Sequence, residues 1–313
     1  MVNFSLILLG IASGLLLKRF RILTRASAQA LNVVVLYLAL PALIFQIVPK
    51  LFRTLPAASH LFVPLSMAWL SFGMAALVFG WLGKRRKWSK ATTGAMILTV
   101  GLGNTSFVGI PLLDALYGRE SLPTILLVDQ PGSFLCLATL GSITASIYSG
   151  SKASFSSISR RVLTFPPFIA LILATLAVFW MPEALRAPWD AVCGKLSAMV
   201  VPLSLISVGL QLEASLDVLR RRARILVLGL TAKLIVVPLL LTGLYVGALR
   251  AVDFQTKITL LESAMAPMIM GAILATESNL DSEIASLMIG VGIPVSLLTV
   301  PGWDLLLSHF LLR

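Results

Sequence analysis

The feature that most restricts the fold of this chain is a succession of apolar runs, each long enough to cross a lipid bilayer. A helix needs about 20 apolar residues to do so, and such runs take up most of the 313 residues, of which 58% are hydrophobic and 12% charged. The sequence therefore predicts an all-α polytopic membrane protein with ten transmembrane helices. The expected spans are residues 2–17, 28–49, 61–83, 91–116, 122–148, 164–181, 191–212, 224–247, 255–276 and 283–309.

The basic residues indicate how these spans are oriented. The 25 Lys and Arg outnumber the 13 Asp and Glu, but they cluster in short connections after spans one, three, five and seven, so no nucleic-acid partner is expected. The positive-inside rule places these connections in the cytoplasm and both termini on the opposite side of the cell (inner) membrane. The first basic cluster, which starts at Lys18, follows the first apolar run. This order predicts a retained helix and not a secretory signal.

Prolines near the middle of several spans suggest an internal repeat. Pro41 pairs with Pro202 and Pro111 with Pro267, at a nearly constant offset of about 160 residues. With five spans in each half, the second half enters the membrane from the other side, which is the inverted-repeat plan of many secondary transporters. We expect a first repeat over residues 1–150, a short cytoplasmic linker over 151–163 and an inverted second repeat over 164–313.

Two of the spans carry helix breakers near their centre. The fourth span contains Gly101, Gly103, Gly109 and Pro111, and the ninth contains Pro267 and Gly271. A proline removes one helical hydrogen bond, and an unsatisfied backbone group in lipid costs several kcal/mol, so such a break is tolerated where it lines a protected cavity. A simple kink without a site is the alternative.

The polar side chains of Asn104, Thr105 and Ser106 lie where this cavity is expected. Two half-helices that point their amino ends at one place present N–H donors and partial positive charge, which suits an anion and above all a carboxylate. Pro41 and Pro202 are expected to break their helices as well. The predicted substrate-binding residues are Gly103, Asn104, Thr105, Ser106, Pro111, Pro267 and Met268.

Three stretches resemble the auxin efflux carrier family, which includes the plant PIN carriers and many bacterial permeases. GNTSFVGIPLLDALYG at 103–118 resembles the fourth-span motif of that family. LALPALIF at 38–45 is similar to its second-span proline motif, and SEIASLMIGVGIPVSLLTV at 282–300 is similar to its last helix. By position, Asn104 matches the family's fourth-span Asn, while Pro111 and Pro267 match its two crossover prolines.

The resemblance implies a ten-helix carrier in which the broken fourth and ninth helices cross. It also implies scaffold and transport subdomains that are interleaved between the repeats, with an elevator-like movement of the transport group. Carriers of this kind move organic anions. The short linker and Glu262 in the ninth span depart from the plant pattern, and an auxin substrate is therefore not implied.

Three charged residues are predicted inside the membrane, where a charge costs at least about 2.5 kcal/mol. Lys233 in the eighth span is expected to take the place that a sodium ion fills in the related bile-acid symporters, although a lysine that snorkels to a polar surface is the alternative. Asp129 and Glu262 are candidate proton carriers. Lys257 lies nearer a predicted span end and is expected to be solvated.

Other classes of function fit the sequence less well. An intramembrane serine hydrolase needs a base near its nucleophile, but the two histidines lie at span ends, so no enzyme activity is expected. Cys136 and Cys193 lie in apolar spans and are expected to be core thiols, and no cofactor or metal site is indicated. The expected partners are a small organic anion and the lipid bilayer; a homodimer and a sodium-coupled symporter on the same scaffold are left open.

Overall fold

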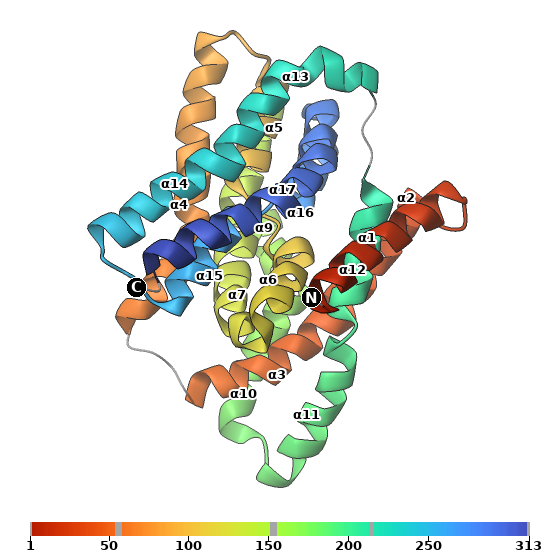
Figure 1. The fold of residues 1–313 in the computed structure, drawn as a ribbon, viewed down its shortest axis with the longest axis vertical. Helices are drawn as coiled ribbons and strands as arrows, with labels where there is room; N and C mark the ends of the chain where they lie inside the picture. Colours follow the sequence, from red (N-terminus) through yellow and green to blue (C-terminus); the bar gives the residue numbers. More distant parts are fainter. Residues whose placement is uncertain (1, 54–57, 151–154, 213–215, 312–313) are drawn as a thin grey trace. The chain divides into compact units, whose positions relative to one another are not determined.

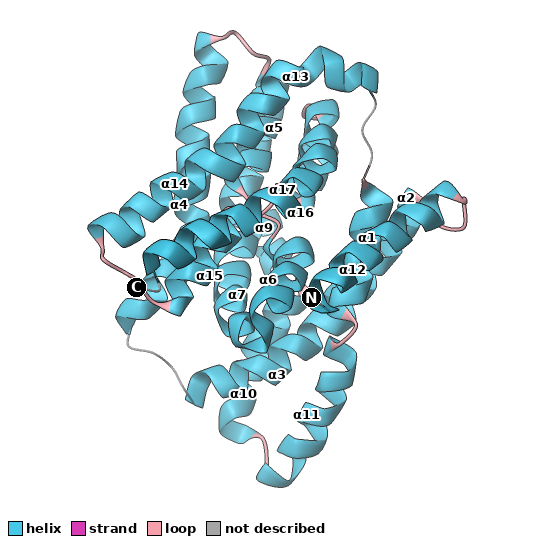
Figure 2. Cartoon of the chain, viewed as in Figure 1, coloured by secondary structure: helices cyan, strands magenta, loops and turns pink. Residues whose placement is uncertain are grey.

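The computed structural model describes residues 2–53, 58–150, 155–212 and 216–311 (Figure 1). These residues form helices joined by loops (Figure 2), and the one strand-like contact among them is an isolated antiparallel bridge between Gly103 and Pro267. The all-helical prediction is confirmed for the described residues.

The α-helices follow one another along the chain as α1 (Val2–Arg19), α2 (Arg25–Val34), α3 (Leu40–Arg53), α4 (Ala58–Arg85), α5 (Lys90–Gly101), α6 (Ile110–Tyr117), α7 (Leu122–Val128), α8 (Ser142–Ser149), α9 (Phe155–Leu163), α10 (Pro166–Trp180), α11 (Glu183–Ser197), α12 (Val200–Gln211), α13 (Leu216–Thr231), α14 (Val237–Thr242), α15 (Phe254–Ser263), α16 (Ile269–Glu277) and α17 (Ser282–Leu311).

Short π-helical turns and one 3₁₀ turn continue several of these helices. The π turns are η1 (Val35–Ala39), η2 (Thr105–Gly109), η4 (Asp129–Phe134), η5 (Leu137–Gly141), η6 (Ala232–Val236) and η7 (Gly243–Ala248), and the 3₁₀ turn is η3 (Gly118–Ser121). Pro41, Pro111 and Pro238 are each the second residue of the α-helix that follows a π turn. Because a proline ring clashes with the carbonyl four residues earlier, a locally wider turn accommodates it without ending the helix.

Within the described residues, six helical segments are long and apolar enough to cross a membrane, as a polytopic membrane protein requires. They are Ala26–Pro49, Leu61–Arg85, Thr105–Ser149, Glu183–Gln211, Asp217–Ala248 and Ser282–His309, and Pro166–Trp180 is a shorter apolar helix. The ten-span arrangement in two inverted repeats remains a prediction.

The chain divides into two compact units, and each unit draws on both halves of the sequence. Unit 1 comprises Met1–Ser59, Ser106–Leu126 and Arg160–Gln211. Unit 2 comprises His60–Thr105, Leu127–Ser159 and Leu212–Arg313.

Glycines hold α1 against α12 in unit 1, where the two helices lie side by side (Figure 1). A Cβ atom added at Gly14 would lie 2.3 Å from the carbonyl oxygen of Ile206, and one added at Gly209 would lie 2.3 Å from that of Ile11. Small residues at facing positions let membrane helices approach at backbone distance, which is how they gain packing energy without a hydrophobic driving force. The two glycines therefore set the separation of α1 and α12.

Replacing Gly209 by leucine should destabilise unit 1, because the new side chain would meet backbone that cannot rotate away. Overpacking of this kind typically costs about 1–3 kcal/mol, and we expect the unfolding temperature in detergent to fall by about 5–10 °C. Gly73→Leu is the matched control, since nothing lies within 4 Å of a Cβ atom at that position. Equal unfolding temperatures for the two variants would show that α1 and α12 do not depend on this contact.

Unit 2 is built around α5, which lies among α8, α16 and α17. A Cβ atom added at Gly94 would lie 2.7 Å from the Cβ of Tyr148, and one added at Gly101 would lie 2.8 Å from the ring of Phe72. The Ser89 hydroxyl caps the amino end of α5 by accepting a 3.0 Å hydrogen bond from the Thr92 N–H. The tight packing and the cap fix where α5 begins and which way it points.

One carboxylate ties two helix ends of unit 2 to the helix α13. Asp281 accepts a 2.7 Å hydrogen bond from the Thr92 hydroxyl at the start of α5 and a 3.2 Å bond from the Ile284 N–H at the start of α17. Its other contact is an ion pair at 3.4 Å with Arg222 of α13. The amino ends of α5 and α17 are therefore held in register with α13.

Candidate functional site: a crossing of two interrupted helices

The predicted interruptions of the fourth and ninth spans are present, and the two broken segments cross and pair with each other. The Asn104 N–H donates a 2.8 Å hydrogen bond to the Ala266 carbonyl, and the Met268 N–H donates a 3.0 Å bond to the Leu102 carbonyl. Between these bonds Gly103 and Pro267 form the antiparallel bridge. The exchange satisfies backbone groups that each broken helix would otherwise leave open, as a nonpolar surrounding requires.

The interruption in the fourth span lies before Pro111 and is centred on Gly103. α5 ends at Gly101, and Leu102 is extended (φ −117°, ψ 130°). The chain resumes helical geometry at η2, so that Pro111 lies beyond the break as the second residue of α6, in unit 1. In the ninth span the break runs between α15 and α16, with Met268 extended (φ −71°, ψ 125°). Two amino-terminal helix ends, at Thr105 and Ile269, thus follow directly on the crossing, with N–H groups and partial positive charge.

Most of the predicted substrate-binding residues lie at this crossing and are buried in unit 2. Gly103, Thr105 and Pro267 are buried, and the side chains of Asn104 and Met268 are only 2% and 7% exposed. Ser106 is half-buried and begins the stretch assigned to unit 1.

The two remaining predicted breaks lie elsewhere, in unit 1. Pro41 lies in a continuous helix just after η1, and Pro202 is the third residue of α12, shortly after α11 ends. Neither proline is part of the crossing in unit 2.

Gly103 is closely packed against its neighbours. A Cβ atom there would lie 3.2 Å from the Lys233 Nζ and 3.2 Å from the Glu262 carbonyl oxygen. Contacts this close make the backbone of the crossing a direct neighbour of the Lys233 ammonium group.

The three predicted charge-coupling residues are brought together beside the crossing. Lys233 is 1% exposed, and its Nζ donates a 2.9 Å hydrogen bond to the Ser263 carbonyl, the last residue of α15. Glu262 is fully buried and interacts electrostatically with both Lys233 and Asp129. The expected alternative for Lys233, a side chain that snorkels to a polar surface, does not fit this burial.

Glu262 and Asp129 differ in how their oxygens are bound. In the part of the chain that the structure describes, neither carboxylate oxygen of Glu262 accepts a hydrogen bond. Asp129 accepts one at 2.5 Å from the Thr105 hydroxyl and one at 2.6 Å from the Gln130 side-chain amide. Buried oxygens without donors are rare in native proteins and call for an explanation such as a bound proton or ligand. The Asp129 bond, in turn, ties the carboxylate to the first residue after the break.

Two tryptophans hold the π turns that carry the charged residues. The Trp303 indole of α17 donates a 2.8 Å hydrogen bond to the Leu234 carbonyl in η6, beside Lys233. Pro238 lacks the N–H that would bond this carbonyl in an α-helix, so the indole satisfies an orphaned acceptor. The Trp69 indole of α4 likewise donates at 3.2 Å to the Pro131 carbonyl in η4, the turn that contains Asp129. Trp303 and Trp69 thus bind the backbone of the turns that contain Lys233 and Asp129.

The Trp303→Phe variant should weaken transport while the protein still folds. The Leu234 carbonyl would lose its donor, which costs about 1–3 kcal/mol, and a misplacement of Lys233 worth about 1.4 kcal/mol would lower the maximum uptake rate roughly tenfold. Trp180→Phe, at an exposed position on α10, is the control and should leave uptake unchanged. If both variants transport like the wild type, the indole does not position Lys233.

The expectation that Lys257 is solvated is wrong. Its side chain is 3% exposed, and the Nζ lies 2.9 Å from an Asp304 carboxylate oxygen and 2.6 Å from the Ser308 hydroxyl. The pair joins α15 to α17, and its burial explains why a charge can be kept there. A position near a predicted span end did not indicate exposure in this case, because α17 covers the Lys257 side chain.

Comparisons with known proteins match nearly the whole chain to membrane transporters. A family model described as a membrane transport protein matches residues 4–304. The chain belongs to this membrane transport protein family. An uncharacterized transporter of Methanothermobacter thermautotrophicus is 29% identical over 297 residues, which cover 94% of each chain. An uncharacterized transporter of Methanocaldococcus jannaschii is 27% identical over an alignment of 316 positions that covers 97% of each chain.

Membership in the membrane transport protein family confirms the resemblance to the auxin efflux carriers. It also agrees with the long apolar helices, so that the protein is an integral, multi-pass membrane transporter.

Sequence reasoning missed some of the residues that shape the site. Gln130 adjoins Asp129 in the sequence and could have been noticed as its hydrogen-bond donor. A proline four residues after Leu234 signals an orphaned carbonyl, but nothing local shows that the donor comes from Trp303, 69 residues further along the chain.

Proposed function

We propose that this membrane transport protein is a secondary transporter of a small organic anion, a carboxylate, that works by elevator-like alternating access without sodium. The observation that carries the proposal is the crossing of two interrupted helices beside a buried lysine. Discontinuous helices whose amino ends meet near the membrane centre are where many secondary transporters bind anionic substrates.

The substrate carboxylate would be held at the crossing. Asn104 carries a side-chain amide that can donate to a carboxylate, and the helix ends at Thr105 and Ile269 add N–H donors and partial positive charge. Met268 and Pro267 would contact the apolar part of the substrate, with Gly103, Ser106 and Pro111 shaping the surrounding backbone. These roles make a small anion with an apolar body the best-matched substrate.

Sodium independence is supported by Lys233, whose ammonium group would supply positive charge where a coupling ion would otherwise be needed. Its Nζ already donates to the Ser263 carbonyl at the end of α15. A sodium site would need several oxygen ligands, whereas Ala266, Met268 and Ile269 at the ninth-span break have apolar side chains. Sodium-coupled symport is the second candidate and would be favoured by sodium-dependent uptake.

Protons are the proposed coupling ions. If Asp129, Glu262 and Lys233 are all charged, the cluster carries a net charge of about −1, and one bound proton makes it neutral. Glu262 supports this role because its buried oxygens accept no hydrogen bond from the described residues. A neutral cluster would favour the binding of an anion next to it.

Elevator-like movement would exchange the site between the two sides of the membrane. In this proposal unit 1 is the scaffold and unit 2, which holds the crossing and the charged cluster, is the transport group. Ten spans in a five-plus-five inverted repeat, non-cytoplasmic termini, location in the cell membrane and a homodimer complete the proposed arrangement. The composition of each unit from both halves of the chain is consistent with interleaved repeats.

The Asn104→Ala variant tests the substrate site. Loss of a hydrogen bond to a charged group costs about 1.5–3 kcal/mol, so we expect KM for the transported carboxylate to rise by about 10- to 100-fold. Gln29→Ala removes an exposed amide from α2 and should leave KM unchanged. An unaltered KM for Asn104→Ala would remove this residue from the site.

A further inference from the structure

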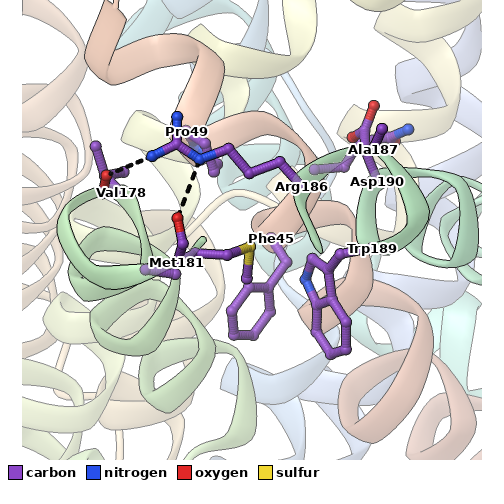
Figure 3. Close-up of a pocket in the computed structure, with 10 residues that line it drawn as sticks. Phe45, Pro49, Val178, Met181, Arg186, Ala187, Trp189 and Asp190 are labelled. Atoms are coloured by element: carbon purple, nitrogen blue, oxygen red, sulfur yellow. Dashed lines mark hydrogen bonds between the residues drawn. The ribbon is translucent and has the colours of Figure 1, made fainter. Parts of the chain in front are cut away.

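A second cavity lies within unit 1, between α3, the carboxyl end of α10 and α11 (Figure 3). Its volume is about 300 Å³, which is at the lower end of small-molecule sites. No residue of the crossing lines it. It is therefore a separate feature of the described chain.

The wall of the cavity is aromatic and apolar. The rings of Phe45 and Trp189 meet edge to face, with centroids 5.6 Å apart and planes at 80°. Pro49, Val178 and Met181 continue the apolar lining. Trp180, 66% exposed, ends α10 close by in the sequence, and such tryptophans are enriched at the depth of lipid headgroups.

The cavity also contains one cation and one anion, Arg186 and Asp190, which are one helical turn apart on α11 and share a face. Both are half-buried, whereas Ala187 and Trp189 between them are exposed. Ala187 and Trp189 also line the cavity, so the two charged groups are the less exposed part of this stretch of the wall.

Arg186 is fixed in place by backbone. Its Nε donates to the Met181 carbonyl at 3.3 Å and its Nη2 to the Val178 carbonyl at 3.4 Å (Figure 3). These carbonyls belong to the end of α10, where helical donors run out. A guanidinium group has five N–H donors, so the two bonds leave others for a ligand.

We propose that this cavity binds the headgroup of a zwitterionic phospholipid of the phosphatidylethanolamine type. Arg186 would hold the phosphate, Asp190 would accept hydrogen bonds from the primary ammonium, and the Phe45–Trp189 wall would cover the adjoining carbon atoms. Guanidinium groups match phosphate oxygens well. The balanced charge of the pair favours a zwitterion over a purely anionic lipid, and the volume admits a headgroup but not a whole lipid.

Native mass spectrometry of the purified full-length protein in detergent tests the proposal. Phosphatidylethanolamine, phosphatidylcholine and phosphatidylglycerol with identical acyl chains are titrated separately. The first ethanolamine lipid should bind about fivefold more tightly than the choline lipid, since the choline group lacks the N–H donors and the difference is roughly one net hydrogen bond. Equal binding of the three lipids, or a preference of the wild type for phosphatidylglycerol, would overturn the proposal.

Two variants separate the charges. Asp190→Asn should reverse the preference so that phosphatidylglycerol binds more tightly than phosphatidylethanolamine, because the remaining charge is positive. Arg186→Gln should weaken the binding of both lipids. Arg86→Gln, an exposed control in unit 2, should leave the binding of both unchanged. A loss of structure in Arg186→Gln leaves the Asp190→Asn reversal as the deciding result. An unchanged lipid preference in Asp190→Asn contradicts the proposed site.

Discussion

Replacing Lys233 by methionine should abolish uptake. The buried Nζ contacts the Ser263 carbonyl and balances Glu262, so its loss leaves a negative cluster beside the site of an anionic substrate. Removing one charge from a group of buried, opposite charges should cost as much as breaking a buried ion pair, about 3–5 kcal/mol, which is enough to lower uptake by more than about 100-fold if the cost falls on the substrate-bound state. Initial uptake rates in liposomes measure the effect.

A double variant distinguishes the effect of losing the Lys233 charge from the effect of losing its packing. Lys233→Met combined with Glu262→Gln removes two interacting charges and should recover part of the folding stability that Lys233→Met loses. Lys195→Met, at an exposed position on α11, is the matched control and should transport normally. Normal uptake by Lys233→Met would show that the buried charge plays no part in transport.

The Gly103→Val variant should also fail to transport, for a steric reason. The first atom of any side chain would lie 3.2 Å from both the Lys233 Nζ and the Glu262 carbonyl oxygen, and the two further methyl groups of valine have less space still. The crossing would open, and the hydrogen bonds of the Asn104 and Met268 N–H groups would lengthen or break. We expect uptake to fall by about 100-fold or more, since small misplacements of a site have effects of this size.

Gly302→Val serves as the control, because nothing lies within 4 Å of a Cβ atom at that position of α17. The amount of folded protein in the membrane is measured for both variants, so that a loss of transport is not confused with a loss of protein. A Gly103→Val protein that is folded and transports at the normal rate would mean that close pairing at the crossing is dispensable.

Helix positions could be predicted from the sequence because they depend on the length of each apolar run. The expected span at 61–83 lies within α4 (Ala58–Arg85), and the one at 283–309 lies within α17 (Ser282–Leu311). The connection predicted over 151–163 contains the helix α9 (Phe155–Leu163). Its apolar residues are too few for a span, and hydropathy therefore does not reveal such a helix.

The site was harder to predict where long-range contacts decide it. Helix breakers showed that the fourth and ninth spans are interrupted, but Pro111 is the strongest breaker by chemistry and the break is centred on Gly103. The position coincides with the backbone pairing between Gly103 and Pro267, a long-range contact that no local pattern encodes. The charged residues could be identified because a charge in an apolar run is conspicuous. Trp303 and Trp69, which donate hydrogen bonds to the turns that contain Lys233 and Asp129, look in the sequence like ordinary membrane tryptophans.

The most direct test of the central claim is the initial rate of uptake of labelled carboxylates by the purified protein in liposomes, with and without sodium and with an imposed pH gradient. We predict saturable uptake of a carboxylate that does not require sodium, that responds to the pH gradient and that is weakened by Asn104→Ala. Uptake that requires sodium, or that is the same in Asn104→Ala and the wild type, would contradict an anion site at the crossing with Lys233 as its built-in cation.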